Sequence, residues 1–187
     1  MQHIGVVLAG GLSSRMGQDK ANLSWHQHTL LQHMQQCLQE SLCQQVLTSR
    51  NHSQGIADRF KNKGPLGGID AVLQQLPEQC FLTILPVDMP LLDSASLIHL
   101  QTISANNRQT VCYQQSFLPC VIVVNNALRS YIEQQLSRAG NYSINAMLDF
   151  ANYQAISHPD PSRLGNANTP QQWCAVINTA ANTMKTI

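Results

Sequence analysis

The sequence predicts an α/β domain with a mostly parallel central sheet and helices on both faces. Strand-like and helix-like segments alternate from the start of the chain, which is typical of strands joined by helical crossovers. The segments 3–8 (HIGVVL) and 80–88 (CFLTILPVD) are apolar almost throughout, as a strand covered on both faces must be. The 187 residues show no internal repeat and no linker, so we expect residues 1–187 to form one domain.

The first half of the chain supplies alternating signals in order. After the strand at 3–8, apolar residues recur at helical spacing from Leu30 to Leu42, with glutamine on the wet face. The segment 44–50 is expected to be a short second strand. In 64–76, Pro65 stands where the first turn of a helix accepts proline.

The second half continues the pattern after the strand at 80–88. A helix is expected at about 93–103, then two apolar segments, QTVCY and LPCVIVV. The segment 125–140 has Asn125 where a helix cap is preferred and Gly140 past the end. A short helix near 143–150, a strand at 153–157 and a loop at 158–170 follow, and Thr169-Pro170 opens a last helix.

Composition argues against partners held by bulk charge. Hydrophobic residues make up 43% of the chain, charged residues 11%, and the formal net charge is +1. These values suggest neither a nucleic-acid partner nor a membrane surface. No apolar run is long enough to span a bilayer, and MQHIGVV lacks the pattern of a secretion signal, so we expect a cytoplasmic protein.

Cysteine and histidine give weak signals. None of the six cysteines is spaced C-x-x-C, and most lie in apolar runs, so we expect buried, reduced thiols. A disulfide framework would need an oxidising compartment, which no other feature supports. His26 and His28 would share one side of a strand, but without neighbouring ligands a solvated turn is favoured over a metal site.

The stretch VVLAGGLSSRMGQDKANLSW (6–25) has the chemistry of a phosphate-binding loop but matches neither common type. A Walker loop needs Gly-Lys followed by Ser or Thr, and here Gly17 and Lys20 are separated. The spacing G-x-G-x-x-G is also absent. Gly10 and Gly11 would let a ligand approach the backbone amides, while Arg15 offers a planar fork and Lys20 a point charge. From these residues alone, a strand-to-helix turn with exposed cations remains as good an interpretation.

A second strand end points to the same edge of the sheet. The strand at 80–88 finishes in PVDMP, with Asp88 between Pro86 and Pro90. In open α/β sheets, ligands bind beyond the carboxyl ends of the strands, as in Rossmann-like nucleotide-binding domains. An Asp in this place suits a magnesium ion, which prefers hard oxygen ligands and needs only one or two carboxylates. A turn or cap Asp is the alternative.

Four blocks together resemble the molybdenum cofactor nucleotidyltransferases. LAGGLSSRMGQDKA (8–21) is similar to their signature L-A-G-G-x-S-x-R-M-G-x-D-K, and GPLGGI (64–69) to their G-P-L-A-G, with glycine for the usual alanine. PVDMPLL (86–92) resembles P-x-D-x-P, and NANTPQQW (166–173) resembles N-x-N-T-P. The blocks come in the family's order over nearly the whole chain. The L-A-G-G tetrad resembles the guanylyl-transferring members, of MobA type, because cytidylyl-transferring members usually carry L-A-A-G.

The resemblance implies a magnesium-dependent transfer of GMP from GTP to molybdenum-molybdopterin, with release of diphosphate. GTP and molybdenum-molybdopterin would be the partners, with other cofactor-biosynthesis proteins and molybdoenzyme apoproteins as further candidates. In such a reaction the protein aligns two anions and offsets their charge.

The resemblance also assigns roles to individual residues. Arg15 and Lys20 would contact the triphosphate, and Asp88 would be the metal-binding catalytic carboxylate. Asp58 falls roughly where the family has an Asp near guanine, although a surface Asp is an equal alternative. Asn166 and Asn168 match the second-substrate loop, with turn and cap chemistry as the alternative. The main chain of the signature loop would line the nucleotide at Leu8, Ala9, Gly10 and Gly11.

Several positions depart from the family's pattern. Thr48 stands where guanylyl-transferring relatives often have Asn, Leu118 where many have His, and Gln171-Gln172 where acidic residues are usual. The stretch NYSI (141–144) replaces a basic residue. The changes at Leu118 and 141–144 bear on the acceptor more than on the nucleotide.

Three other functions remain open from the sequence. One is the same transfer from CTP, against which the L-A-G-G tetrad argues. Another is a sugar-phosphate nucleotidyltransferase, which generally needs more chain and has no place for NANTP. The third is a non-catalytic GTP-binding module that hands cofactor to a partner, against which Arg15, Lys20 and Asp88 argue.

Overall fold

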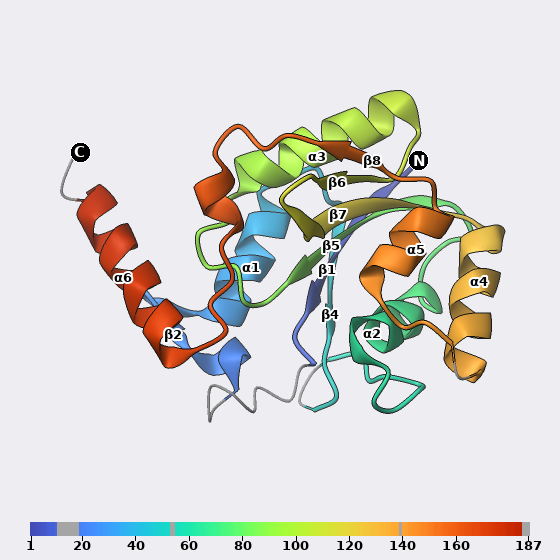
Figure 1. Cartoon of the computed structure of the whole chain (residues 1–187), viewed down its shortest axis with the longest axis horizontal. Helices are drawn as coiled ribbons and strands as arrows, with labels where there is room; N and C mark the ends of the chain where they lie inside the picture. The colour runs from blue at the N-terminus through green and yellow to red at the C-terminus, as the bar shows by residue number, and fades with distance from the viewer. Residues whose placement is uncertain (11–18, 53–54, 139, 185–187) are drawn as a thin grey trace.

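The computed structural model describes residues 1–10, 19–52, 55–138 and 140–184, and its centre is a six-stranded sheet of order β4-β1-β5-β7-β6-β8 (Figure 1). β4, β1, β5, β6 and β8 run in one direction and β7 in the other. The predicted mostly parallel sheet is therefore confirmed. The strands are β1 (His3–Leu8), β4 (Gln45–Ser49), β5 (Cys80–Pro86), β6 (Val111–Tyr113), β7 (Ser116–Val124) and β8 (Gln154–Ile156).

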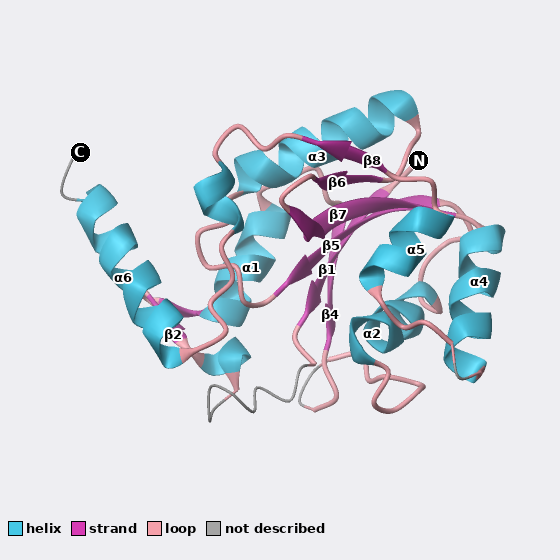
Figure 2. Ribbon diagram, in the orientation of Figure 1, coloured by secondary structure: helices cyan, strands magenta, loops and turns pink. Residues whose placement is uncertain are grey.

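Helices cover both faces of this sheet, as predicted (Figure 2). One face packs against α1 (Leu30–Gln39) and α3 (Ser94–Asn107). The other packs against α2 (Gly64–Leu73), α4 (Asn126–Ser137) and α5 (Ile144–Phe150). The last helix, α6 (Pro170–Met184), projects beside the first face, which it meets through Trp173 and Val176.

The inner strands show why their sequences are apolar throughout. Val7 packs into the cluster under α1 and α3, while Ile4 and Val6 pack into the cluster under α2 and α4. All three side chains are fully buried. A strand that meets a helical layer on each face has no wet side, which matches the expectation for 3–8 and 80–88.

Helix starts follow the sequence closely. Thr29 and Gln32 form a reciprocal capping box at α1, and the Asn125 side chain accepts from Leu128 N at 2.9 Å at α4. Thr169 makes the same kind of reciprocal bonds with Gln172 before Pro170. These caps satisfy amide groups that the first helical turn leaves without partners.

Helix ends were predicted less well. The apolar spacing in 30–42 was extended through Leu42, but α1 ends at Gln39 and Leu42 is 43% exposed. The turn there is held by buried Gln101, whose Oε1 accepts from Leu42 N at 3.0 Å. The apolar spacing continues to Leu42, but the helix ends earlier, at a turn that this tertiary hydrogen bond holds.

The structure tests most of the predictions made for histidine and cysteine residues. His26 and His28 lie exposed at the short hairpin of β2 (Ser24–Trp25) and β3 (His28–Thr29), which confirms the solvated turn. All six thiols are free, and Cys37, Cys80, Cys112 and Cys120 are buried as expected. Cys174 on α6 is exposed, so the expectation of burial was wrong there. In the described part of the chain, no helix combines the length and apolar character needed to cross a membrane.

Candidate active site

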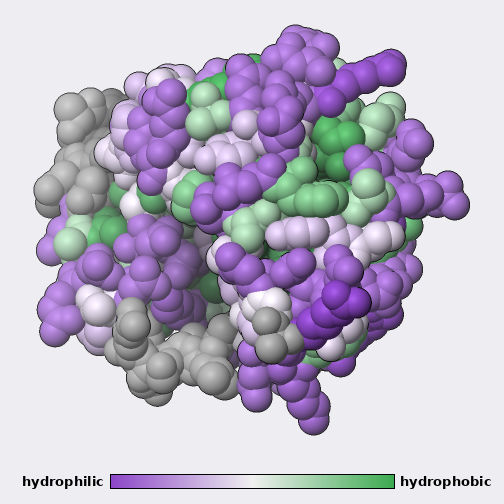
Figure 3. All heavy atoms as spheres, turned by 45° about the vertical axis from the view of Figure 1, so that its right-hand side comes forward, coloured by the Kyte–Doolittle hydropathy of each residue, from purple (hydrophilic) through white to green (hydrophobic). Residues whose placement is uncertain are grey.

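The carboxyl ends of β1, β4 and β5 open into a cavity of about 600 Å³. Figure 3 shows a hollow in this face of the molecule. One wall is formed by the strand ends and another by the start of α2. The described residues lining it are Leu8, Ala9, Gly10, Asp19, Lys20, Ser49, Asn51, Asp58, Asn62, Gly64, Pro65, Gly68, Pro86, Val87, Asp88 and Leu118.

The strand ends are joined to one another beyond the regular sheet. Ala9 N donates to Ser49 O at 2.9 Å, and Val87 N donates to Leu8 O at 3.1 Å. Leu8, Ala9 and Gly10 therefore form part of the cavity wall, where the sequence placed them. Gly11 and Arg15, the other two predicted residues of this loop, lie outside the described residues.

Three of the four motif blocks meet at one point through Lys20. Its Nζ donates to Asp88 Oδ2 at 2.8 Å and to Asn168 Oδ1 at 2.5 Å. Lys20 opens the short helix η1 (Lys20–Asn22), Asp88 follows β5, and Asn168 comes from the loop before α6. Ala167 N also donates to Asp88 O at 2.8 Å, which ties the loop to the strand end. The structure therefore brings Lys20, Asp88 and Asn168 together, and their roles at a site stay a prediction.

The ion pair between Lys20 and Asp88 is accessible to a ligand. The two side chains are 14% and 17% exposed, and both line the cavity. The pair is thus mostly buried, but both residues border the open space of the cavity. Its groups can therefore exchange partners when an anion or a cation enters the cavity.

Asn166 behaves differently from Asn168. It is exposed, whereas Asn168 is partly buried, and neither asparagine is among the described residues that line the cavity. The two asparagines of the N-x-N pattern thus point to different surroundings. The structure brings only Asn168 next to Lys20 and Asp88.

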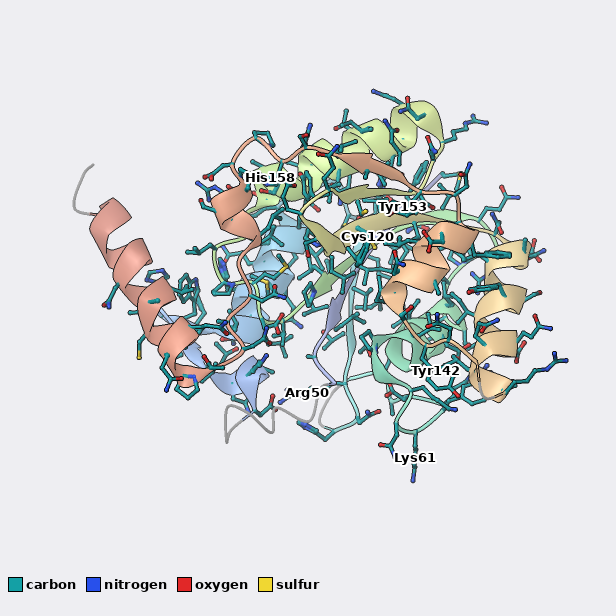
Figure 4. All side chains as sticks on the ribbon, viewed as in Figure 1. Arg50, Lys61, Cys120, Tyr142, Tyr153 and His158 are labelled. Carbon is teal, nitrogen blue, oxygen red and sulfur yellow. The ribbon has the colours of Figure 1, made fainter. Side chains whose placement is uncertain are left out.

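Sequence reasoning missed Arg50. Its side chain, 8% exposed, extends from the end of β4 toward η1 (Figure 4), where Nη2 meets Asp19 Oδ2 at 2.5 Å. Asp19 also caps η1 by accepting from Ala21 N at 3.0 Å. Arg50 and Asp19 together hold the turn that presents Lys20. Asp19 is a fixed residue of the signature pattern, which was the available signal, but the burial of Arg50 follows from tertiary packing alone.

A second carboxylate, Asp58, lies in the cavity beside the start of α2. Asn51 Nδ2 donates to Asp58 Oδ2 at 3.0 Å, and Asp58 N donates to Asn51 Oδ1 at 2.8 Å. Both side chains line the cavity. Asp58 therefore lies on the cavity wall and is held there by Asn51, while its role near guanine stays a prediction.

The structure also shows the contacts of the residues that depart from the family pattern. Thr48 Oγ1 accepts from Gln35 Nε2 of α1 at 2.9 Å, on the side of the sheet away from the cavity. Gln172 Oε1 accepts from Asn168 N at 2.8 Å and so supports the loop that carries Asn168. In the 141–144 stretch, the Tyr142 hydroxyl accepts from Lys63 Nζ at 2.6 Å, next to the start of α2. Leu118 contributes an apolar side chain to the cavity wall.

Residues 5–154 match a family described as the MobA-like NTP transferase domain. The chain belongs to this family. It is 35% identical to a molybdenum cofactor guanylyltransferase of Xanthomonas euvesicatoria over 179 residues, which span 93% of this chain and 94% of the relative. A probable molybdenum cofactor guanylyltransferase of Opitutus terrae is 36% identical, but over 49% of this chain and 50% of that protein.

Solved structures agree on the fold. The molybdopterin-guanine dinucleotide biosynthesis protein A of Archaeoglobus fulgidus superposes with a TM-score of 0.75, at 16% identity, over 96% of this chain and 99% of that one. The 2-C-methyl-D-erythritol 4-phosphate cytidylyltransferase of Thermus thermophilus gives 0.62 at 12% identity, over 97% and 100%. One scaffold is therefore shared by proteins named for guanine and cytosine chemistry, so the fold alone does not identify the base.

Proposed function

We propose that this MobA-like NTP transferase transfers GMP from GTP to molybdenum-molybdopterin. The observation that carries the proposal is the meeting of Lys20, Asp88 and Asn168 at the carboxyl edge of the sheet. These residues come from three of the blocks on which the family resemblance depends. The name of the Xanthomonas relative, which matches nearly the whole chain, supports the same reaction.

In this reaction, a terminal phosphate oxygen of molybdopterin forms a bond to the α-phosphorus of GTP. The bond from that phosphorus to the bridging oxygen breaks, and diphosphate leaves with the electron pair. The protein's task is to align the two anions and to offset their charge. Lys20 supplies an ammonium to the polyphosphate, and the adjacent Asn168 offers an amide to the acceptor.

The charges on the cavity wall favour a divalent cation as part of the substrate complex. Of the described lining residues, Lys20 is the only cation, against the carboxylates of Asp19, Asp58 and Asp88. A triphosphate entering this wall needs added positive charge. Magnesium fits Asp88, because it takes hard oxygen ligands and completes its shell with water and phosphate oxygens. When bound, the ion would neutralise charge on the phosphates.

The need for few protein ligands also matches the site. Among the described residues, no group of three or more His, Cys, Asp or Glu side chains could hold a metal unaided. A zinc-type site, which needs three or four such ligands, is therefore a poorer fit to the described residues than magnesium.

The opposite part of the cavity suits a purine base. Leu8, Pro65 and Leu118 contribute apolar surface, and Asp58 contributes a hydrogen-bond acceptor. Guanine presents two donors on one edge, N1–H and the 2-amino group, which a carboxylate accepts together. Cytosine lacks this pair of donors, so Asp58 favours GTP over CTP.

A transfer assay tests the proposal directly. Purified protein is incubated with magnesium, molybdenum-loaded molybdopterin and either GTP or CTP, and both diphosphate and the dinucleotide are measured. We expect both products from GTP, in equal amounts and only when the acceptor is present. Dinucleotide from CTP alone would replace GTP by CTP in the proposal. GTP binding without diphosphate release would indicate a non-catalytic nucleotide-binding module.

A further inference from the structure

The Asn51–Asp58 pair is more specific than a chance surface contact. The two residues are joined by two hydrogen bonds, one in each direction, and both residues line the cavity. The backbone N–H of Asp58 can only donate, so the oxygen of the Asn51 amide must face it. The amide NH₂ then faces the Asp58 carboxylate. The orientation of Asn51 is thereby fixed by a group that cannot reverse its role.

Two glycines enclose the Asp58 carboxylate on another side. A Cβ added to Gly67 would lie 3.6 Å from Asp58 Oδ2, and one added to Gly68 would lie 3.5 Å from Oδ1. Both oxygens are therefore near the backbone of α2. With the Asn51 amide on Oδ2, the carboxylate has little freedom to rotate. Each carboxylate oxygen accepts two hydrogen bonds, so Oδ2 keeps the capacity to accept from a ligand as well.

The position of Asn51 also bears on a departure from the family pattern. Guanylyl-transferring relatives often carry Asn where this chain has Thr48, at the end of the second strand. Thr48 is bonded to Gln35 of α1 and does not line the cavity. Asn51, three residues further on, is the residue whose side-chain amide reaches the cavity from this strand end.

We propose that Asn51 is a positioning residue that sets the specificity of this chain for guanine. It holds the Asp58 carboxylate so that both oxygens face the N1–H and 2-amino donors of the base. The inference rests on the proposed function, since it takes guanine as the base. Asn51 itself need not touch the nucleotide, so its removal should affect recognition of the base and leave the transfer step intact.

Inosine triphosphate provides the diagnostic ligand, because it keeps N1–H and lacks the 2-amino group. GTP and inosine triphosphate are titrated calorimetrically with magnesium and no acceptor into the wild-type protein and two variants. Asn51→Asp nearly preserves shape and turns the donor toward Asp58 into an acceptor, and Asn51→Ala removes both bonds. The matched control is Asn145→Ala, since Asn145 Nδ2 donates to Asp149 Oδ2 at 3.2 Å on the exposed side of α5.

We expect the wild type to bind GTP about tenfold or more tightly than inosine triphosphate, as one charge-assisted hydrogen bond implies. Both Asn51 variants should bring this ratio to within about threefold, mainly by weakening GTP. Asn145→Ala should keep the wild-type ratio. In steady-state transfer, the variants should raise KM for GTP while kcat stays near the wild-type value.

The possible outcomes distinguish a failure of this inference from a failure of the proposed function. Wild-type protein that binds the two nucleotides equally overturns both the inference and the assignment of Asp58 to guanine. A wild type that prefers GTP, with variants that fold and keep the same preference, overturns the role of Asn51 and leaves the proposed function standing. The wild-type comparison remains decisive even if one variant fails to fold.

Discussion

Replacing Gly68 by alanine tests how α2 is held against β4 at the cavity wall. A Cβ on Gly68 would lie 2.3 Å from Ser49 Oγ and 3.3 Å from Ser49 Cβ. Ser49 is 2% exposed, so the hydroxyl has little room in which to turn away. Forcing an extra methyl into such a contact costs about 1–3 kcal/mol. Alanine regains about 1 kcal/mol of helix propensity, so we expect a net loss of up to about 2 kcal/mol.

The preceding glycine supplies a matched control in the same helix. A Cβ on Gly67 would meet Phe60 O at 3.2 Å and Lys63 Cβ at 3.3 Å, which shifts of a few tenths of an ångström relieve. Gly67→Ala gains the same helix propensity without the severe contact, so its stability should lie within about 1 kcal/mol of the wild type. The difference between the two variants isolates the contact with Ser49.

Urea unfolding under reducing conditions measures both variants, with the midpoint compared at constant m-value. In a domain of this size, the expected loss corresponds to a decrease in Tm of up to about 8 °C. Adding Ser49→Ala to Gly68→Ala removes the oxygen and should restore most of the stability. The reasoning is wrong if Gly68→Ala is as stable as Gly67→Ala, or if Ser49→Ala leaves its cost unchanged.

Four further changes test the site and its surroundings. Lys20→Ala should weaken GTP binding at least about tenfold, as expected for a lost charge-assisted contact; a calorimetric dissociation constant within twofold of the wild-type value would contradict its role. Asp88→Asn should abolish magnesium-dependent turnover, because an amide is a weaker magnesium ligand than a carboxylate; unchanged turnover would remove Asp88 from the mechanism. Burial lowers the pKa of His158 below 6.5, despite the nearby carboxylates of Asp93 and Asp160. Below about pH 6.5, the unfolded chain therefore binds a proton at His158 that the folded chain does not bind. The free energy of unfolding should decrease as the pH is lowered through this range, and it should decrease less steeply in His158→Gln. Burial raises the pKa of Cys37 to about 12, so a thiol reagent at neutral pH should label exposed Cys174 first; equal rapid labelling in Cys174→Ser would contradict this.

Much of the fold followed from the sequence, because burial on two faces leaves a distinct trace. The segment 3–8 matches β1 in both bounds, and the strand predicted at 80–88 is β5, which ends at Pro86. The hydrophobic pattern of the sequence does not indicate the direction of a strand. Buried β7 is as apolar as its parallel neighbours, and it runs against them because β6 and β7 are joined by a tight reversal at 114–115.

The residues of the candidate site were also predicted only in part. Lys20, Asp88 and Asn168 were found because each sits in a motif with fixed spacing, and the structure joins them by hydrogen bonds. Arg50 and Asn51 were missed because they lie between β4 and α2, where no periodicity marks which side chains turn inward. Arg50 is buried through contact with Asp19, 31 positions earlier, a pairing that single-sequence spacing does not encode.

There is a physical reason why some site residues could be predicted from the sequence and others could not, and it bears on how this fold acquires specificity for a ligand. Strand ends and cap positions are constrained by packing and backbone hydrogen bonding, so the fold is shared with the Archaeoglobus protein at 16% identity. In the proposed function, the base contacts Asp58, which Asn51 positions, and both residues lie on an irregular connection where a residue can move along the chain without disturbing the sheet. The proposed choice of nucleotide is therefore tested best by substitutions in the connection between β4 and α2, and least well by comparing the sheet with those of related folds.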